Sequence, residues 1–155
     1  MIPSTTHTRA AIVTLTLLLA APAPAQTPAP IQVQETNIDG VVAELTECRR
    51  EDGVLNIRVR FRNNSDQDVG LYVVDTGKFN AHYLTAGTKK YFILRDTEKT
   101  ALANATDGGG NVRASMKKGG TFIWWAKFPA PPPEVKKVSY FTPVTGPFDN
   151  VPIQD

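Results

Sequence analysis

One eight-residue stretch constrains the fold of this chain more than any other. Across residues 55–62, apolar side chains alternate with polar ones, and the apolar members are Leu55, Ile57, Val59 and Phe61. Successive side chains of a β-strand point to opposite faces, so a period of two predicts a strand with one buried and one polar face. We expect this strand to be central, with Ile57 and Val59 in the core.

The chain from residue 39 onward contains further patterns that are typical of β-strands. Short runs of β-branched and aromatic residues are separated by turn residues, and no helical period extends beyond about ten residues. We expect strands over residues 41–48, 69–74, 81–84, 90–94, 112–116, 121–128 and 135–142. Residues 129–133 should leave the sheet, because proline has no N–H to donate. About seven or eight such strands predict an all-β, two-layer antiparallel immunoglobulin-like sandwich, with a closed barrel as the alternative.

The first 25 residues predict a signal peptide. Arg9 precedes an uncharged apolar run over residues 10–21, and Ala23-Pro24-Ala25 supplies a small-x-small cleavage pattern. The run is shorter than the roughly 20 apolar residues of a spanning helix. We therefore expect general secretory export, cleavage after Ala25, a periplasmic or secreted protein, and no stable membrane insertion after cleavage. An uncleaved N-terminal anchor is the alternative.

The composition of the remaining chain predicts a linker followed by one domain, and it excludes one class of partner. Residues 26–38 are rich in Pro, Ala and Gln and predict a flexible linker, whereas residues 39–155 predict one β-sandwich domain. The chain has 17 Lys and Arg against 15 Asp and Glu, a balance that excludes a strongly basic nucleic-acid binder. Its single cysteine, Cys48, cannot close a disulfide within the chain, so the core must supply the stability. We expect a monomer.

Residues that could carry catalysis or bind a metal are few. Without the leader, His82 is the only imidazole, and the chain has no Gly-x-Ser-x-Gly nucleophile motif. We predict no catalytic residues, no cofactor, and a protein that is not an enzyme. A copper site of His82, Cys48 and Met116 would suit an exported sandwich, but such sites normally use at least two histidines. We expect instead that Cys48 and Met116 are packed in the interior and that His82 lies at a strand edge.

Three arginines form the first candidate binding feature. Arg58, Arg60 and Arg62 share one face of their strand because of the period of two. Their guanidinium groups could bind phosphate or carboxylate groups of an anionic envelope polymer. The alternative is an ordinary solvent face whose arginines are paired with acids on neighbouring strands.

Two adjacent tryptophans form the second candidate feature. Trp124 and Trp125 must point to opposite faces of their strand. Trp124 shares its side with Phe122, Ala126 and Phe128, so we expect it in the core. Trp125 is either covered by a loop or the tail, or exposed as a contact platform.

Four stretches together resemble secreted bacterial immunoglobulin-like domains of unknown function, including those found beside outer-membrane OmpA-type modules. They are VRFRNNS at residues 59–65, KYFILRD at 90–96, GGT at 119–121 followed by WAKFPAPP at 125–132, and PFDNVPI at 147–153. The resemblance implies the fold and export, and it implies no catalytic residues. We therefore expect a non-catalytic, exported binding module for an envelope protein or polymer. A small periplasmic inhibitor or chaperone-like protein is the alternative, followed by a copper-handling module.

Overall fold

The computed structural model describes residues 29–155, and the predicted signal peptide lies outside them. The described chain is all-β, as predicted, and its only helical element is the 3-10 helix η1 (Phe79–Ala81). None of the helices in this part of the chain is long and apolar enough to cross a membrane. The strands are β1 (Gln32–Glu35), β2 (Val41–Glu51), β3 (Val54–Asn63), β4 (Val69–Val74), β5 (Tyr83–Ala86), β6 (Lys89–Phe92), β7 (Val112–Met116), β8 (Thr121–Pro129), β9 (Lys137–Phe141) and β10 (Phe148–Pro152).

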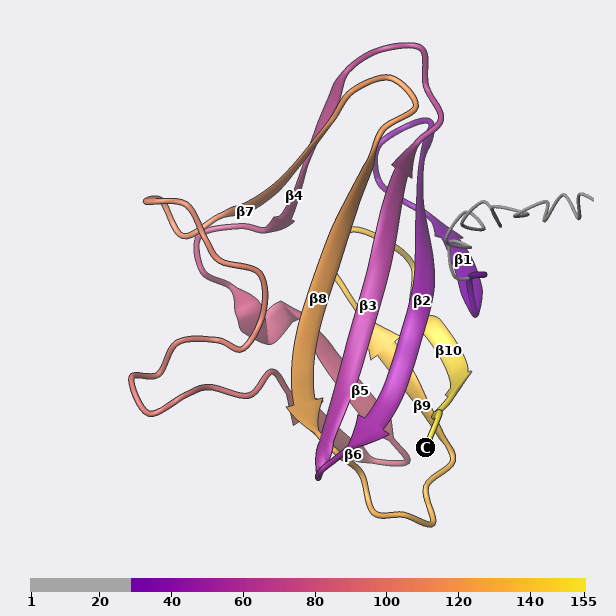
Figure 1. Cartoon of the computed structure of the whole chain (residues 1–155), viewed down its shortest axis with the longest axis vertical. Coiled ribbons are helices and arrows are strands. Elements are labelled where there is room, and N and C mark those ends of the chain that lie inside the picture. Colours follow the sequence, from indigo (N-terminus) through magenta and orange to yellow (C-terminus); the bar gives the residue numbers. More distant parts are fainter. Residues whose placement is uncertain (1–28) are drawn as a thin grey trace, which may run out of the picture.

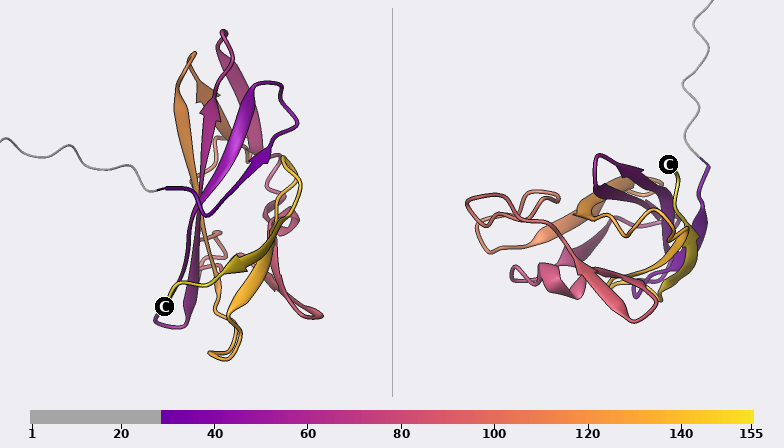
Figure 2. Two further views of the ribbon diagram at one scale, coloured as in Figure 1. Left: turned by 90° about the vertical axis from the view of Figure 1, so that its right-hand side faces the viewer. Right: turned by 90° about the horizontal axis from the view of Figure 1, so that it is seen from below.

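Two four-stranded antiparallel sheets form the layers of a β-sandwich. The first sheet has the order β1-β2-β3-β8 and the second has the order β10-β9-β5-β6. Figure 1 shows the first sheet in front of the second, and Figure 2 shows the two layers from the side. Strands β4 and β7 form a separate antiparallel pair next to β8. The antiparallel sandwich is therefore confirmed, and the closed barrel is not observed among residues 29–155.

The alternating stretch of residues 55–62 forms the centre of the first sheet. Strand β3 lies between β2 and β8, and Ile57 and Val59 are each only 1% exposed, which confirms their predicted place in the core. The hairpin from β2 to β3 turns at Asp52 and Gly53, which have φ angles of 49° and 77°. Positive φ at both central residues is the geometry of a type I′ turn, for which Asp-Gly is a favoured pair. Local turn chemistry thus fixes the register of this hairpin.

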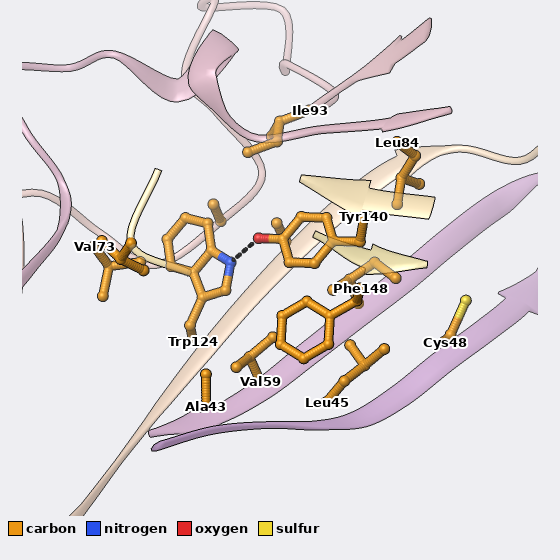
Figure 3. Close-up of a cluster of buried hydrophobic side chains, with 14 of the residues drawn as sticks. Ala43, Leu45, Cys48, Val59, Val73, Leu84, Ile93, Trp124, Tyr140 and Phe148 are labelled. Carbon is orange, nitrogen blue, oxygen red and sulfur yellow. Dashed lines mark hydrogen bonds between the residues drawn. The ribbon is translucent and has the colours of Figure 1, made fainter. Parts of the chain in front are cut away.

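The core fills the space between the sheets. Leu45 and Val59 from the first sheet meet Phe148 and Tyr140 from the second (Figure 3). Trp124 lies among them, as predicted, and its indole Nε1–H donates a hydrogen bond of 2.8 Å to Tyr140 Oη. This bond satisfies the one polar atom of a large buried ring, so the ring contributes its apolar area without leaving an unpaired donor.

His82 lies inside this core, which corrects its predicted position at a strand edge. The side chain is 0% exposed, and its Nε2 lies 2.9 Å from the carbonyl oxygen of Val73. A carbonyl only accepts, so Nε2 carries the proton and Nδ1 accepts from the Tyr140 hydroxyl at 3.1 Å. Burial lowers the pKa of His82 to about 4, so the ring is neutral at pH 7. No local pattern predicts this position, because the partners Val73 and Tyr140 belong to strands β4 and β9.

The predicted flexible linker over residues 26–38 is wrong for residues 32–35. These residues form β1, which pairs antiparallel with β2 along its whole length. The amide groups of Gln32 and Gln34 donate to the carbonyl oxygens of Asp149 and Pro147, at 2.6 and 2.8 Å. Glutamine side chains therefore tie the edge of the first sheet to the segment of β10, and this contact orders a segment whose composition is typical of a linker.

The structure has more strands than expected, and some are longer, such as β2, which continues to Glu51 where the sequence predicted an end at residue 48. Ten strands lie within residues 29–155, where the sequence predicted seven or eight. Strand β8 continues to Pro129, which pairs with Val54, so the chain leaves the sheet one residue later than predicted. Proline is tolerated there because a strand end needs no further ladder bond, and the next N–H, from Ala130, donates to the carbonyl oxygen of Gly53 at 2.9 Å.

Candidate functional site

All four predicted binding residues lie on the outer face of the first sheet, which is the face turned away from the second sheet. Arg58, Arg60 and Arg62 are on β3, and Trp125 is on the neighbouring β8. The register places Arg58 opposite Trp125. Cross-strand partners stand about 5 Å apart at Cβ, so these two side chains share one local surface.

A β-bulge in β2 brings two carboxylates to the same outer face. The pairing of β2 with β3 shifts between Leu45 and Glu47, so Thr46 is the extra residue. Before the bulge Glu44 pairs with Arg60, and after it Glu47 pairs with Arg58. An uninterrupted period of two would have turned Glu47 to the opposite face from Glu44. With the bulge, Glu44 lies beside Arg60 and Glu47 lies beside Arg58 on the outer face.

Arg60 is part of the structure rather than an open binding group. Its side chain is 9% exposed, and its Nε donates to Glu44 Oε2. Arg62 Nη2 donates to the other oxygen of the same carboxylate at 2.7 Å. The neighbours of this pair across the sheet are apolar, Val33 on β1 and Ile123 on β8. The expectation of three arginines on one solvent-facing row therefore fails at Arg60.

Arg58 and Trp125 are exposed and have no short ion pair within the described part of the chain, whereas Arg62, with 42% of its side chain exposed, is held by Glu44. The side chains of Arg58 and Trp125 line a hollow of about 270 Å³, which we call the outer-face hollow, together with Glu47, Asn56 and Lys127. The Arg58 side chain is 52% exposed and Trp125 is 37% exposed. Arg58 Nη1 lies 3.4 Å from Glu47 Oε2, a loose and solvent-accessible ion pair. The structure thus brings two of the four predicted residues into one site.

A loop residue that sequence reasoning did not identify holds the backbone beneath this site. The Asn104 side chain accepts a hydrogen bond from the backbone N–H of Trp125 at 2.8 Å and donates to the carbonyl oxygen of Ile123 at 3.1 Å. The Asn104 amide thereby makes the two backbone hydrogen bonds that a neighbouring strand would make at this edge of β8. The loop binds the backbone of Trp125 and leaves the indole ring partly exposed, so the platform alternative describes Trp125 better than the covered one.

The outer-face hollow combines groups that bind extended polar ligands. The indole offers an apolar surface for stacking, and Arg58 and Lys127 offer charged donors for phosphate or carboxylate groups. Asn56 adds an amide that both donates and accepts, and Glu47 adds an acceptor. The arrangement can therefore hold a ligand with anionic and hydroxyl groups.

The residues considered for a copper site do not form one. Cys48 and Met116 are buried in the core, as predicted, and burial raises the pKa of the Cys48 thiol to about 12. Both ring nitrogens of His82 are engaged in hydrogen bonds. Within residues 29–155, no three His, Cys, Asp or Glu side chains converge as a metal-binding group.

Comparisons of the chain with protein-family models, with curated proteins and with solved structures find no match. The resemblance to secreted immunoglobulin-like domains therefore stays a prediction.

Proposed function

We propose that this chain is an exported, non-catalytic immunoglobulin-like module that binds an anionic envelope polymer through the outer-face hollow. The observation that carries the proposal is the pairing of Arg58 with Trp125 in register, with both side chains open to solvent. A flat ring beside a guanidinium group suits a ligand that alternates sugar faces with acidic groups. Export rests on the predicted leader over residues 1–25.

The loose pair of Arg58 with Glu47 favours exchange with a ligand. Its separation of 3.4 Å and the exposure of Arg58 are those of a surface ion pair. Such pairs contribute roughly 0–1 kcal/mol. A phosphate or carboxylate of the polymer can therefore replace Glu47 as the partner of Arg58 at little cost. The tighter pair at Arg60 and Glu44 lacks this freedom because both side chains are buried.

The strand order supports the immunoglobulin-like part of the proposal. The order β2-β3-β8 corresponds to strands A-B-E of immunoglobulin folds, and β6-β5-β9-β10 corresponds to C′-C-F-G. Strand β7 takes the place of D in the chain but pairs with β4 rather than with β8. Strand β1 is an addition at the edge of the first sheet.

The chemistry of the hollow supports a binding role without catalysis. Its described lining contains no Ser, Thr, Cys or His that could act as a nucleophile or an imidazole base. The single imidazole of the described chain, His82, is buried between Val73 and Tyr140 and is out of reach of a surface ligand.

The proposal is tested by co-sedimentation of the mature protein with purified, insoluble anionic envelope polysaccharide at low salt. We expect Trp125→Ala and Arg58→Gln each to lower retention about tenfold, since stacking and charge-assisted hydrogen bonds are each worth about 1–3 kcal/mol. Phe92→Ala and Arg95→Gln are matched controls, because both residues are exposed and lie outside the hollow. Retention equal to the wild type in both hollow variants would overturn the proposal.

A further inference from the structure

The β4–β7 pair carries a second arrangement of polar side chains, separate from the outer-face hollow. Its register sets Tyr72 opposite Arg113 and Gly70 opposite Ser115. The intervening residues Leu71 and Ala114 are buried in the core, so these four residues share the solvent face of the pair. Figure 1 shows this pair beside β8, away from the second sheet.

Arg113 reaches diagonally from β7 over Gly70 on β4. Its Cζ lies 5.6 Å from the centroid of the Tyr72 ring, within cation–π range. A Cβ added at position 70 would lie 2.6 Å from Arg113 Nη2 and 2.8 Å from Nε. Glycine inside a strand often marks the close approach of another group. At this position it leaves the space that the guanidinium group occupies.

The charge of Arg113 is not balanced by a neighbouring acid. Among residues 29–155, no carboxylate forms an ion pair with Arg113, whereas the nearby Lys117 binds Asp68 at 2.6 Å. A hollow of about 240 Å³ opens beside the guanidinium group, and its polar lining includes Ser115 as well as the Lys117–Asp68 pair. A fixed cation therefore faces an open space with a hydroxyl donor at its edge.

We propose that this hollow is an oxyanion site, in which Arg113 and Ser115 bind a phosphate or carboxylate group of a ligand. The guanidinium group offers parallel N–H donors that match two oxygens of either anion. Tyr72 holds the guanidinium group from one side, and the bare backbone of Gly70 provides its floor. The ordering of the Arg113 side chain is thus achieved before the ligand binds, which lowers the entropic cost of binding.

The first test follows the Arg113 side chain directly. In ¹⁵N-labelled mature protein, the Nε–H resonance of Arg113 is recorded by NMR during titration with inorganic phosphate and, separately, with acetate. We expect saturable shifts in the wild type. Arg113→Gln should weaken phosphate binding by about tenfold or more. Because this variant has no Arg113 Nε–H, its binding is followed at the backbone amide resonances near Ser115. Arg95→Gln, which removes an exposed guanidinium elsewhere, should bind as the wild type does. Equal binding by Arg113→Gln and the wild type would overturn the site.

A second variant separates the site from the fold. Gly70 has no positive φ, so alanine fits its backbone, but the new methyl group must displace the Arg113 guanidinium. Gly70→Ala should keep the melting temperature and weaken phosphate binding several-fold. Unchanged phosphate binding in Gly70→Ala would contradict the role of Gly70 as the floor of the site.

The source of the anion is distinguished by vesicles. Phosphatidylglycerol vesicles that retain the wild type but not Arg113→Gln would identify a lipid headgroup. A phosphate response without such retention would identify a soluble or polymer-borne anion. The site fails if neither probe distinguishes Arg113→Gln from the wild type. Because Arg58→Gln leaves this site intact, its result separates failure of the oxyanion site from failure of the outer-face proposal.

Discussion

Polar side chains in the core of the sandwich and on the outer face of its first sheet differ in how fully they are paired and buried. Inside, His82, Tyr140 and Trp124 form one hydrogen-bonded chain in which each group has a partner. Outside, the arginines of β3 range from the buried ion pair of Arg60 to the exposed Arg58. Alternation along a strand assigns a side chain to a face, and its cross-strand neighbour decides whether it is open to a ligand.

The largest expected effect comes from comparing two variants of β3, one with a new carboxylate in the core and one with a new carboxylate on the outer face. Ile57→Asp should prevent folding, because an unpaired carboxylate in the core costs several kcal/mol and the aliphatic contacts are lost as well. Asn56→Asp adds the same group on the outer face and should change the free energy of unfolding by less than about 1 kcal/mol. Far-UV circular dichroism with urea titration measures both. A folded Ile57→Asp variant of normal stability would show that β3 is not the core strand.

The adjacent tryptophans extend the same contrast to β8. Trp124→Ala should cost about 4 kcal/mol, since it empties a core site and leaves Tyr140 without its indole donor. Trp125→Ala should cost about 1 kcal/mol or less because that ring is partly exposed. Chemical unfolding of the two variants measures the difference. Similar losses would mean that the two rings are equally engaged in packing.

Lowering the pH should reduce the free energy of unfolding through protonation of the buried His82. The pKa of His82 is about 4 in the folded protein, against an ordinary histidine value of 6.5, so the unfolded chain binds more protons between these values. Stability should therefore fall as the pH drops from 6.5 towards 4, by about 3 kcal/mol from this group. Urea midpoints across that range measure the effect, and His82→Gln should remove this component of the pH dependence. An identical pH profile in His82→Gln would contradict the assignment.

Much of the fold could be predicted from local pattern, and the failures share one physical cause. The alternation of residues 55–62 and the Asp52-Gly53 turn are local signals, and both features are present in the structure. Strand β1 was missed because its glutamines gain their role from partners more than 110 residues away. The burial of His82 depends likewise on Val73 and Tyr140, which no local period reveals.

The candidate site was predictable only in part for a related reason. The period of two placed Arg58, Arg60 and Arg62 on one face correctly. It could not show that a bulge at Thr46 turns both Glu44 and Glu47 towards them. The bulge carries no strong sequence signal, yet the register around it sets Glu44 opposite the buried Arg60 and Glu47 opposite the exposed Arg58.

Urea unfolding of Arg60→Gln beside Arg58→Gln tests the central claim most directly, because the two changes are chemically identical and lie on one face of one strand. We predict a loss of about 2 kcal/mol for Arg60→Gln, below the usual 3–5 kcal/mol for a broken buried pair because Arg62 still binds Glu44. Arg58→Gln should lose less than about 0.5 kcal/mol, as expected for a loose surface pair. Equal losses in the two variants would contradict the division of this face into a structural part and an open part.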